Sequence, residues 1–249
     1  MPLHRLNHMY KVSLIYEWKI NHFLKIYTFF TNFPYNSKQI TQGGFFMSMY
    51  GEYKPTLELI LNDLMTRINQ MNSDYQQAHE QSLFEHLNGR IKTEKSMEAK
   101  CKKKNLPLTP HSALRENRDA IGLRIVCNFV DDIYTCIDLI EQMPDVTVVK
   151  KKDYITNAKP NGYRSYHMIL SKKVDQIDVD GNIPGEYYVE IQLRTIAMDT
   201  WAALEHEIKY KHHIKNPEMI GRELKRVSDE LASCDISMQT IRQLIKEDN

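Results

Sequence analysis

Four segments of strand length, separated by helix patterns and turn signals, most constrain the fold of this chain. They are rich in β-branched, aliphatic or aromatic residues, and they span 121–129, 146–149, 165–170 and 187–194. The first is a nearly continuous apolar run that Arg124 interrupts. Strands that are interleaved with helices predict an α+β fold, in which helices pack against a mixed β-sheet.

Helical periodicity predicts the elements that flank this sheet. Apolar residues at helical spacing predict a helix over 55–74, and a second helix is expected to follow it as far as Leu87. Asp131-Asp132 is the expected N-cap of a helix that ends before Pro144. A further helix is expected over about 196–210, directly after the last strand.

The C-terminal part of the chain carries a heptad stripe. Apolar residues alternate four and three positions apart at Ile220, Leu224, Val227, Leu231, Cys234, Met238, Ile241 and Ile245. This spacing predicts one long helix within 216–249. Two interpretations are open: the helix packs on its own domain, or it pairs with the same helix of another subunit.

Composition limits the partners that this chain can bind. A hydrophobic content of 42% over 249 residues suits one globular domain with an appendage. The formal net charge of +1 argues against a protein that coats DNA or RNA through its global field, so anion binding must come from local clusters. One such cluster runs from Arg90 to Lys104, where seven Lys or Arg stand against two Glu. For Lys102–Lys104, a solvated basic helix end is the expected explanation, whereas Arg90, Lys92 and Lys100 are expected to contact phosphate.

Cysteine and histidine spacing argues against disulfide and zinc chemistry. The four cysteines form no C-x-x-C pair, and the ten histidines form no H-E-x-x-H motif. Neither a disulfide framework nor a zinc site is indicated. A reducing cytoplasm is therefore the expected compartment.

Residues 1–46 differ in character from the rest of the chain. They are rich in aromatic residues, but charged residues interrupt every apolar run before it could span a membrane, and no signal-peptide cleavage site follows. Gln42-Gly43-Gly44 can be encoded by a bacterial ribosome-binding sequence, a short distance before Met47. We hypothesise that 1–46 is translated upstream or leader sequence and that the native start is Met47 or Met49. Endogenous peptides from 1–40 would contradict this hypothesis.

Two motifs gather polar side chains beside predicted strands. In Lys159-Pro-Asn-Gly-Tyr-Arg-Ser-Tyr-His167, the Asn-Gly pair favours a tight turn that holds Tyr163 out beside a strand. In Val189-Glu-Ile-Gln-Leu-Arg194, side chains alternate between the two faces of a strand. A carboxylate, an amide and a guanidinium therefore share one face.

These two motifs resemble the synthetase domain of the RelA/SpoT family, specifically its small, single-domain alarmone synthetases. Arg90–Ser96 resembles the basic ATP-binding strand and helix start of that family, and Asp119–Arg124 resembles its D-x-x-G-x-R strand. Tyr166 and the order of Ala120-Ile121 depart conservatively from the family pattern. The resemblance implies a nucleotidyltransferase-like domain over 47–215 and a C-terminal oligomerisation helix over 216–249, with a homotetramer as the expected assembly.

The resemblance also implies a reaction, namely transfer of the β,γ-pyrophosphate of ATP to the 3′-hydroxyl of GDP or GTP with release of AMP. Glu190 is the expected base, and Glu190 and Asp119 together are expected to hold Mg²⁺. The expected ATP-binding residues are Arg90, Lys92, Ser96, Lys100 and Arg124. The expected GDP- or GTP-binding residues are Lys159, Tyr163, His167 and Gln192, with the Tyr163 ring stacked on guanine.

Plainer interpretations exist for each of these residues. Glu190 could be an exposed strand carboxylate, Asp119 a helix or strand cap, Tyr163 a half-buried loop aromatic and His167 a strand histidine with satisfied hydrogen bonds. Alternative functions are a pyrophosphokinase that acts on an adenine nucleotide or tRNA, or a non-catalytic module that binds nucleotides or single-stranded RNA. The chain contains no His-Asp dipeptide, so the alarmone hydrolysis of two-domain relatives is not expected. No membrane or DNA partner is expected.

Overall fold

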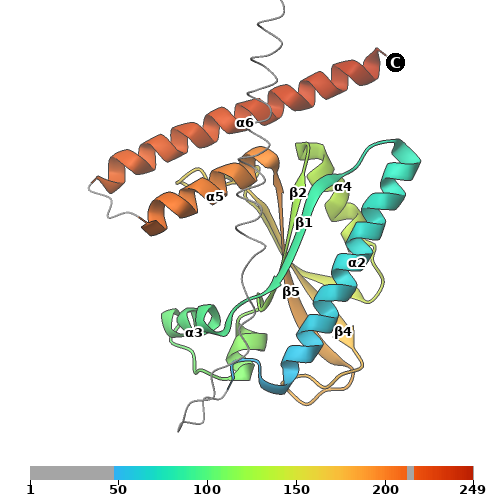
Figure 1. Cartoon of the computed structure of the whole chain (residues 1–249), viewed down its shortest axis with the longest axis vertical. Coiled ribbons are helices and arrows are strands. Elements are labelled where there is room, and N and C mark those ends of the chain that lie inside the picture. Colours follow the sequence, from blue (N-terminus) through green and yellow to red (C-terminus); the bar gives the residue numbers. More distant parts are fainter. Residues whose placement is uncertain (1–47, 212–215, 249) are drawn as a thin grey trace, which may run out of the picture. The chain divides into compact units, whose positions relative to one another are not determined.

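A five-stranded mixed sheet forms the centre of the protein (Figure 1). The computed structural model describes residues 48–211 and 216–248, within a unit that spans Phe46–Asn249. The sheet has the order β1-β2-β5-β4-β3. Its strands are β1 (Phe84–Ile91), β2 (Ile121–Cys127), β3 (Val146–Asp153), β4 (Tyr166–Val174) and β5 (Gly185–Thr195). Strands β2 and β5 are parallel, and the other neighbouring pairs are antiparallel. The predicted α+β class with a mixed sheet is confirmed.

Helices flank this sheet in the order of the chain. They are α2 (Lys54–His79), α3 (Glu94–Lys103), α4 (Val130–Glu141), α5 (Ile196–Lys211) and α6 (Pro217–Glu247), and a π-helical turn lies at Ser112–Glu116. Helices α2 and α4 cover one face of the sheet. That face is apolar because alternate strand residues point to it: Leu123, Met168 and Ile191 pair across three adjacent strands and are all buried. The opposite face is left to polar residues.

The predicted second helix before Leu87 is wrong. Helix α2 continues to His79 and ends at Glu80, whose positive φ of 57° stops it. The side chain of Asn72 then accepts from the backbone N–H of Leu83 at 2.8 Å, at the start of β1. A bulge between Phe84 and His86 breaks the alternation of this edge strand, so its period-2 pattern is hidden in the sequence.

The predicted N-cap at Asp131-Asp132 is also wrong. Phe129 is the N-cap of α4 without a side-chain hydrogen bond, and both aspartates lie in the first helical turn. Asp132 is buried there, and its Oδ1 accepts from Arg242 Nη1 of α6 at 2.6 Å. A distant cation, which the local sequence cannot reveal, therefore determines where this carboxylate points.

The heptad stripe forms one helix, α6, which packs on α5 and α4. Leu224 and Ser228 in its N-terminal half are buried. Apolar residues nearer its C-terminal end remain exposed, namely Ile236, Met238, Ile241, Leu244 and Ile245. The helix thus packs on its own domain and still presents an apolar surface, and oligomerisation stays a prediction.

Two further expectations concern the N-terminal part and membranes. The hypothesis about residues 1–46 lies outside the described residues. Among the helices that the structure does describe, none combines the length and the apolar character needed to cross a bilayer.

Candidate active site

The strand register places two rows of residues across the polar face of the sheet. The first row consists of Arg90, Gly122, Glu190, Ile169 and Lys150. The second consists of Asn88, Arg124, Gln192, His167 and Lys152. Directly opposed residues on neighbouring strands stand about 5 Å apart at Cβ. Five predicted site residues, from four different strands, therefore meet on one face.

A cavity of about 560 Å³ opens over this face, which is a size suited to a small-molecule ligand. Its lining includes four predicted site residues: Lys100, Asp119, His167 and Glu190. Gly122 lies between Arg90 and Glu190 in the first row, and a Cβ built on it would meet nothing within 4 Å. The missing side chain keeps the space above the sheet open.

Asp119 precedes β2 and is held by two cations. Its Oδ2 accepts from Lys92 Nζ and, at 2.5 Å, from Lys100 Nζ. Its Oδ1 is buried and has no hydrogen-bond partner among the described residues. Burial raises the pKa of Asp119, but the hydrogen bonds from Lys100 and Lys92 outweigh burial and leave the pKa below its ordinary value. Asp119 is thus an ionised carboxylate with one free oxygen.

Glu190 of β5 is the second carboxylate at this cavity. Its Oε1 lies 3.5 Å from Nδ1 of His167, and its Oε2 accepts from Gln192 Nε2 at 3.0 Å. Burial raises the pKa of Glu190, yet the interaction with His167 and the hydrogen bond from Gln192 bring it below its ordinary value. The plain interpretation of an exposed surface carboxylate does not fit these contacts.

The two carboxylates meet the basic requirement of a magnesium site. Among the described residues no group of three or more His, Cys, Asp or Glu could hold a metal by itself. Mg²⁺ commonly takes one or two carboxylates and completes its shell with substrate phosphates and water. Asp119, whose Oδ1 has no hydrogen-bond partner among the described residues, and Glu190 line the same cavity and fit that pattern.

Tyr163 lies at the centre of a second cluster. Its hydroxyl is 2.7 Å from Nε2 of His167 and accepts from Arg194 Nη2 at 2.8 Å. Lys159 Nζ lies 4.6 Å from the ring centroids of both Tyr163 and Tyr154. The loop motif thus brings Lys159, Tyr163 and His167 together. Stacking of guanine on Tyr163 stays a prediction.

Sequence reasoning missed Arg194 and Tyr154 as site residues. The guanidinium of Arg194 is only 6% exposed and donates to Tyr163, Gln192 and Asp199. Its place on the polar side of the alternating strand was the available signal. Tyr154 follows β3 and had no such signal, because only the fold brings its ring near Tyr163 and His167.

Arg124 lies close to the guanidinium groups of Arg194 and Arg90. Its Nη1 is 3.3 Å from Oδ1 of Asp199, while its Nε has no hydrogen-bond partner among the described residues. Burial and then the charge of Arg194 lower the pKa of Arg124. Arg90 adds to the same effect. Such an arrangement favours an anionic ligand, which would offset the repulsion between the cations.

The remaining donor-side residues lie beside the cavity. Thr93 caps α3, and its Oγ1 accepts from the backbone N–H of Ser96 at 3.3 Å. Ser96 and Arg90 are exposed and do not belong to the cavity lining, whereas Lys92 reaches it through Asp119. Ser96 therefore lies at a helix N-terminus, where backbone N–H groups can receive phosphate oxygens.

Further cations line the cavity and were not expected from the sequence. They are Lys104, Arg115, Arg118, Lys150 and Lys152. Arg115 is engaged by Asp178, Asp180 and Glu186. Lys150 and Lys152 belong to a run of charged residues that reads as a solvated strand end, and only the pairing of β3 with β4 places them beside His167 and Ile169.

Comparisons with known proteins agree with this geometry. The family described as "Region found in RelA / SpoT proteins" matches residues 89–215. The GTP pyrophosphokinase YwaC of Bacillus subtilis is 36% identical over 184 residues, which are 74% of this chain and 85% of that protein. The GTP pyrophosphokinase YjbM of the same organism is 33% identical over 187 residues, or 75% of this chain and 85% of that protein.

Solved structures give the same result. The small alarmone synthetase 1 from Bacillus subtilis bound to its product pppGpp matches with a TM-score of 0.67 and 33% identity, over 76% of this chain and 94% of that chain. A GTP pyrophosphokinase family protein from Streptococcus pneumoniae matches with a TM-score of 0.68 and 29% identity, over 79% of this chain and 94% of that chain. On sequence and on structure, the chain belongs to the RelA/SpoT family.

Proposed function

We propose that this protein is a (p)ppGpp synthetase, which transfers the β,γ-pyrophosphate of ATP to the 3′-hydroxyl of GDP or GTP and releases AMP. The observation that carries the proposal is the meeting of Asp119 and Glu190 at one cation-lined cavity on the polar sheet face. The similarity to GTP pyrophosphokinases and to a synthetase bound to pppGpp supports the choice of acceptor. No hydrolysis of the product is expected.

On the donor side, cations neutralise the triphosphate. Arg90 and Arg124 lie in adjacent rows of the sheet, and Lys92 and Lys100 converge on Asp119. As the acceptor oxygen bonds to the β-phosphorus, the bond from that phosphorus to the oxygen bridging to the α-phosphate breaks, and AMP leaves with the negative charge. Fixed cations at this position stabilise that developing charge without reorganisation.

On the acceptor side, the Tyr163 cluster receives the nucleotide. The ring of Tyr163 would stack on guanine, and Lys159, His167 and Gln192 would contact phosphate or ribose. Glu190 would accept the proton of the 3′-hydroxyl as the new bond to phosphorus forms, and would later pass it to water. Its lowered pKa keeps it ionised at neutral pH, and its hydrogen bond from Gln192 fixes its direction.

Magnesium would be held by Asp119 and Glu190. A bound Mg²⁺ supplies neutralisation of phosphate charge and orientation of the phosphate groups. The lysines on Oδ2 of Asp119 leave its Oδ1 free for this purpose.

We also propose a domain organisation and an assembly for the chain. The synthetase domain would comprise 47–215, and 216–249 would serve as an oligomerisation helix in a cytoplasmic homotetramer. The exposed apolar residues near the end of α6 support an assembly through this helix.

The function is tested by AMP release in the presence of ATP, Mg²⁺ and one acceptor at a time: GDP, GTP, ATP or tRNA. We expect release with GDP and GTP only. Glu190→Gln should lower kcat at least about a hundredfold while nucleotide binding persists. Glu207→Gln, at an exposed position of α5, is the matched control. Turnover with ATP or tRNA in place of the guanine nucleotides would contradict the proposed acceptor.

A further inference from the structure

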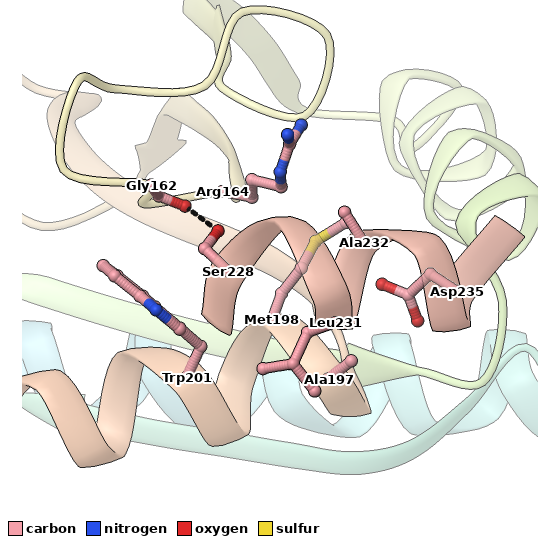
Figure 2. A pocket seen from close by; sticks show the side chains of 9 residues that line it. All are labelled: Gly162, Arg164, Ala197, Met198, Trp201, Ser228, Leu231, Ala232 and Asp235. Atoms are coloured by element: carbon pink, nitrogen blue, oxygen red, sulfur yellow. Dashed lines mark hydrogen bonds between the residues drawn. The ribbon is translucent and has the colours of Figure 1, made fainter. Parts of the chain in front are cut away.

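Helix α6 contacts the loop that carries Tyr163, at a point far from the exposed apolar end of the helix. Figure 2 shows Ser228 of α6 directed at the backbone of Gly162. The hydroxyl of Ser228 donates to the carbonyl oxygen of Gly162 at 2.5 Å, and both residues are buried. A buried carbonyl that loses its donor costs free energy, so this contact favours one loop conformation.

The backbone of Gly162 is adapted to this contact. Its φ of +93° suits glycine, and a Cβ built on it would lie 2.7 Å from Ser228 Cβ and 3.3 Å from Lys225 Cα. The loop can approach α6 this closely only because residue 162 has no side chain. The turn is closed by a hydrogen bond from the Gly162 N–H to the Lys159 carbonyl oxygen at 2.8 Å. The backbone of the loop is therefore packed directly against Ser228 and Lys225 of α6.

Two neighbouring contacts act in the same direction. Trp201 Nε1 of α5 donates to the Leu224 carbonyl oxygen of α6 at 2.8 Å, and its ring meets the Tyr163 ring edge to face at a centroid distance of 6.4 Å. On the other side of Tyr163, Arg164 Nη2 lies 3.5 Å from Oδ1 of Asp229. Helix α6 thus holds the residues on both sides of Tyr163 in the chain and supports the Trp201 ring beside it.

We propose that Ser228 is a positioning residue for the guanine acceptor. The carbonyl of Gly162 and the N–H of Tyr163 belong to one planar peptide group, so fixing the carbonyl fixes the plane from which the Tyr163 side chain extends. A ring that is held in place before the ligand arrives loses less conformational freedom on binding, which lowers the acceptor Kd. This inference rests on the proposed function, because it assigns guanine to Tyr163.

A purely structural role for Ser228 makes a different prediction. The donor-side residues Arg90, Lys92 and Lys100 lie on or next to β1 and α3, whereas α6 packs on α5 and α4. General loosening of the fold would weaken the binding of both substrates. Loss of loop positioning should weaken the binding of the acceptor alone.

The test compares Ser228→Ala with Ser233→Ala in the full chain. Ser233 lies on the same helix but is exposed, and its hydroxyl donates to the Asp229 carbonyl oxygen. We expect Ser228→Ala to raise the KM and Kd for GDP about fivefold, as for loss of one hydrogen bond, with both constants for ATP unchanged. Amide exchange of residues 159–165 in the ligand-free protein should also become faster. Ser233→Ala should change none of these quantities.

Several outcomes decide the inference. Unchanged GDP constants in a folded Ser228→Ala protein overturn it, as does an equal loss for GDP and ATP. If Ser228→Ala does not fold, Asp229→Asn, which removes the negative charge that faces Arg164, should raise the KM for GDP about twofold, and no change would overturn the inference. A parent protein without turnover overturns the proposed function instead. The exchange of 159–165 then still decides whether Ser228 holds the loop.

Discussion

The Asp119 carboxylate depends on the two lysines that contact its Oδ2. Burial alone would raise its pKa, and the hydrogen bonds from Lys100 and Lys92 bring the pKa below its ordinary value. In the same way, burial raises the pKa of Glu190, while His167 and Gln192 lower it. Both pKa values lie below the ordinary range of these side chains. The pH dependence of the reaction should therefore report on the neighbours of the two carboxylates.

Because the pKa values of both carboxylates are lowered, the acid limb of kcat/KM is expected at lower pH than for ordinary Asp and Glu side chains. Lys100→Met removes one of the two cations that lower the pKa of Asp119. The effect of burial is then less well offset, and the pKa of Asp119 rises. The acid limb should then move to higher pH. This shift is separate from any fall in the plateau value of kcat/KM, which weaker ATP binding would cause. Lys104→Met is the control, because Lys104 also lines the cavity but makes no contact with Asp119 that stabilises its charge. A limb at the same pH in Lys100→Met would contradict this account.

Tyr163 gives a second test at the residue scale. Tyr163→Leu removes the aromatic face, and base stacking on such a face contributes about 1–3 kcal/mol, so the KM for GDP should rise about tenfold or more. Tyr163→Phe keeps the ring but loses the hydrogen bonds with His167 and Arg194, and its effect should be smaller. KM values for GDP and ATP, measured for both variants, separate the effect of the ring from that of the hydroxyl. Equal effects of Leu and Phe would mean that the ring does not stack on the base.

Sequence patterns placed some polar residues of the candidate site on one strand face and missed others, whose position depends on how the strands and loops come together. Glu190 and Gln192 were predictable from the period of two in one strand. Tyr154 and Lys152 were not, because their approach to Tyr163 and His167 depends on how β3 pairs with β4. The orientation of Asp119 required α3 to bring Lys100 back to the sheet.

At the scale of elements, the loop between β4 and β5 is organised by one buried carboxylate. Asp178 is 1% exposed and accepts from the backbone N–H groups of Asp180, Asn182 and Glu186 and from Arg115 Nη2. Burial raises its pKa, but the hydrogen bonds from the N–H groups of Glu186 and Asn182 reverse the effect and lower it to about 2. Asp178 thus ties this loop to the cation that borders the active-site cavity.

Asp178→Asn should lower the free energy of unfolding at neutral pH by about 2 kcal/mol. A carboxyl whose pKa is lowered in the folded state stabilises the protein above its unfolded pKa, near 3.9, and this stabilisation is lost as the pH falls towards about 2. The difference between the parent and Asp178→Asn should therefore shrink over that interval. Urea unfolding at pH 7, 4 and 3 measures it. A difference that is constant with pH would contradict the assignment.

Two elements show why secondary structure was only partly predictable. The alternation of β1 is interrupted by its bulge, so residues up to Leu87 were read as helix. The first turn of α4 carries Asp131 and Asp132, which resemble a cap, yet Asp132 is drawn to Arg242 of α6. In contrast, α6 and β5 have long regular patterns without such interruptions, and both were predicted correctly.

At the scale of the whole molecule, α6 combines buried contacts to its own domain with an exposed apolar segment. Its inner side reaches the acceptor loop through Ser228 and α4 through Arg242. Towards the C-terminal end, Met238, Ile241 and Ile245 are 51–59% exposed and line an open cavity beside Phe129. An apolar stripe of this kind suits a contact with a second copy of the chain, as the heptad spacing predicts.

Ile241→Asp is expected to lower the particle mass, because it places a charge in the proposed subunit contact. Light scattering after size-exclusion chromatography measures this mass directly. Ser237→Asp adds the same charge to α6 at an exposed polar position outside the heptad stripe, and should leave the mass unchanged. A parent protein that is monomeric at all concentrations would refute assembly through α6.

The central claim is that the cavity on the polar sheet face transfers pyrophosphate to a guanosine 3′-hydroxyl. The most direct measurement follows the label from ATP carrying a radioactive γ-phosphate, with GDP or 3′-deoxy-GDP as acceptor. We predict that the label appears in a guanosine product in equal amount to AMP with GDP, and not with 3′-deoxy-GDP. Label transfer of equal rate to both acceptors, or none to GDP, would contradict the account.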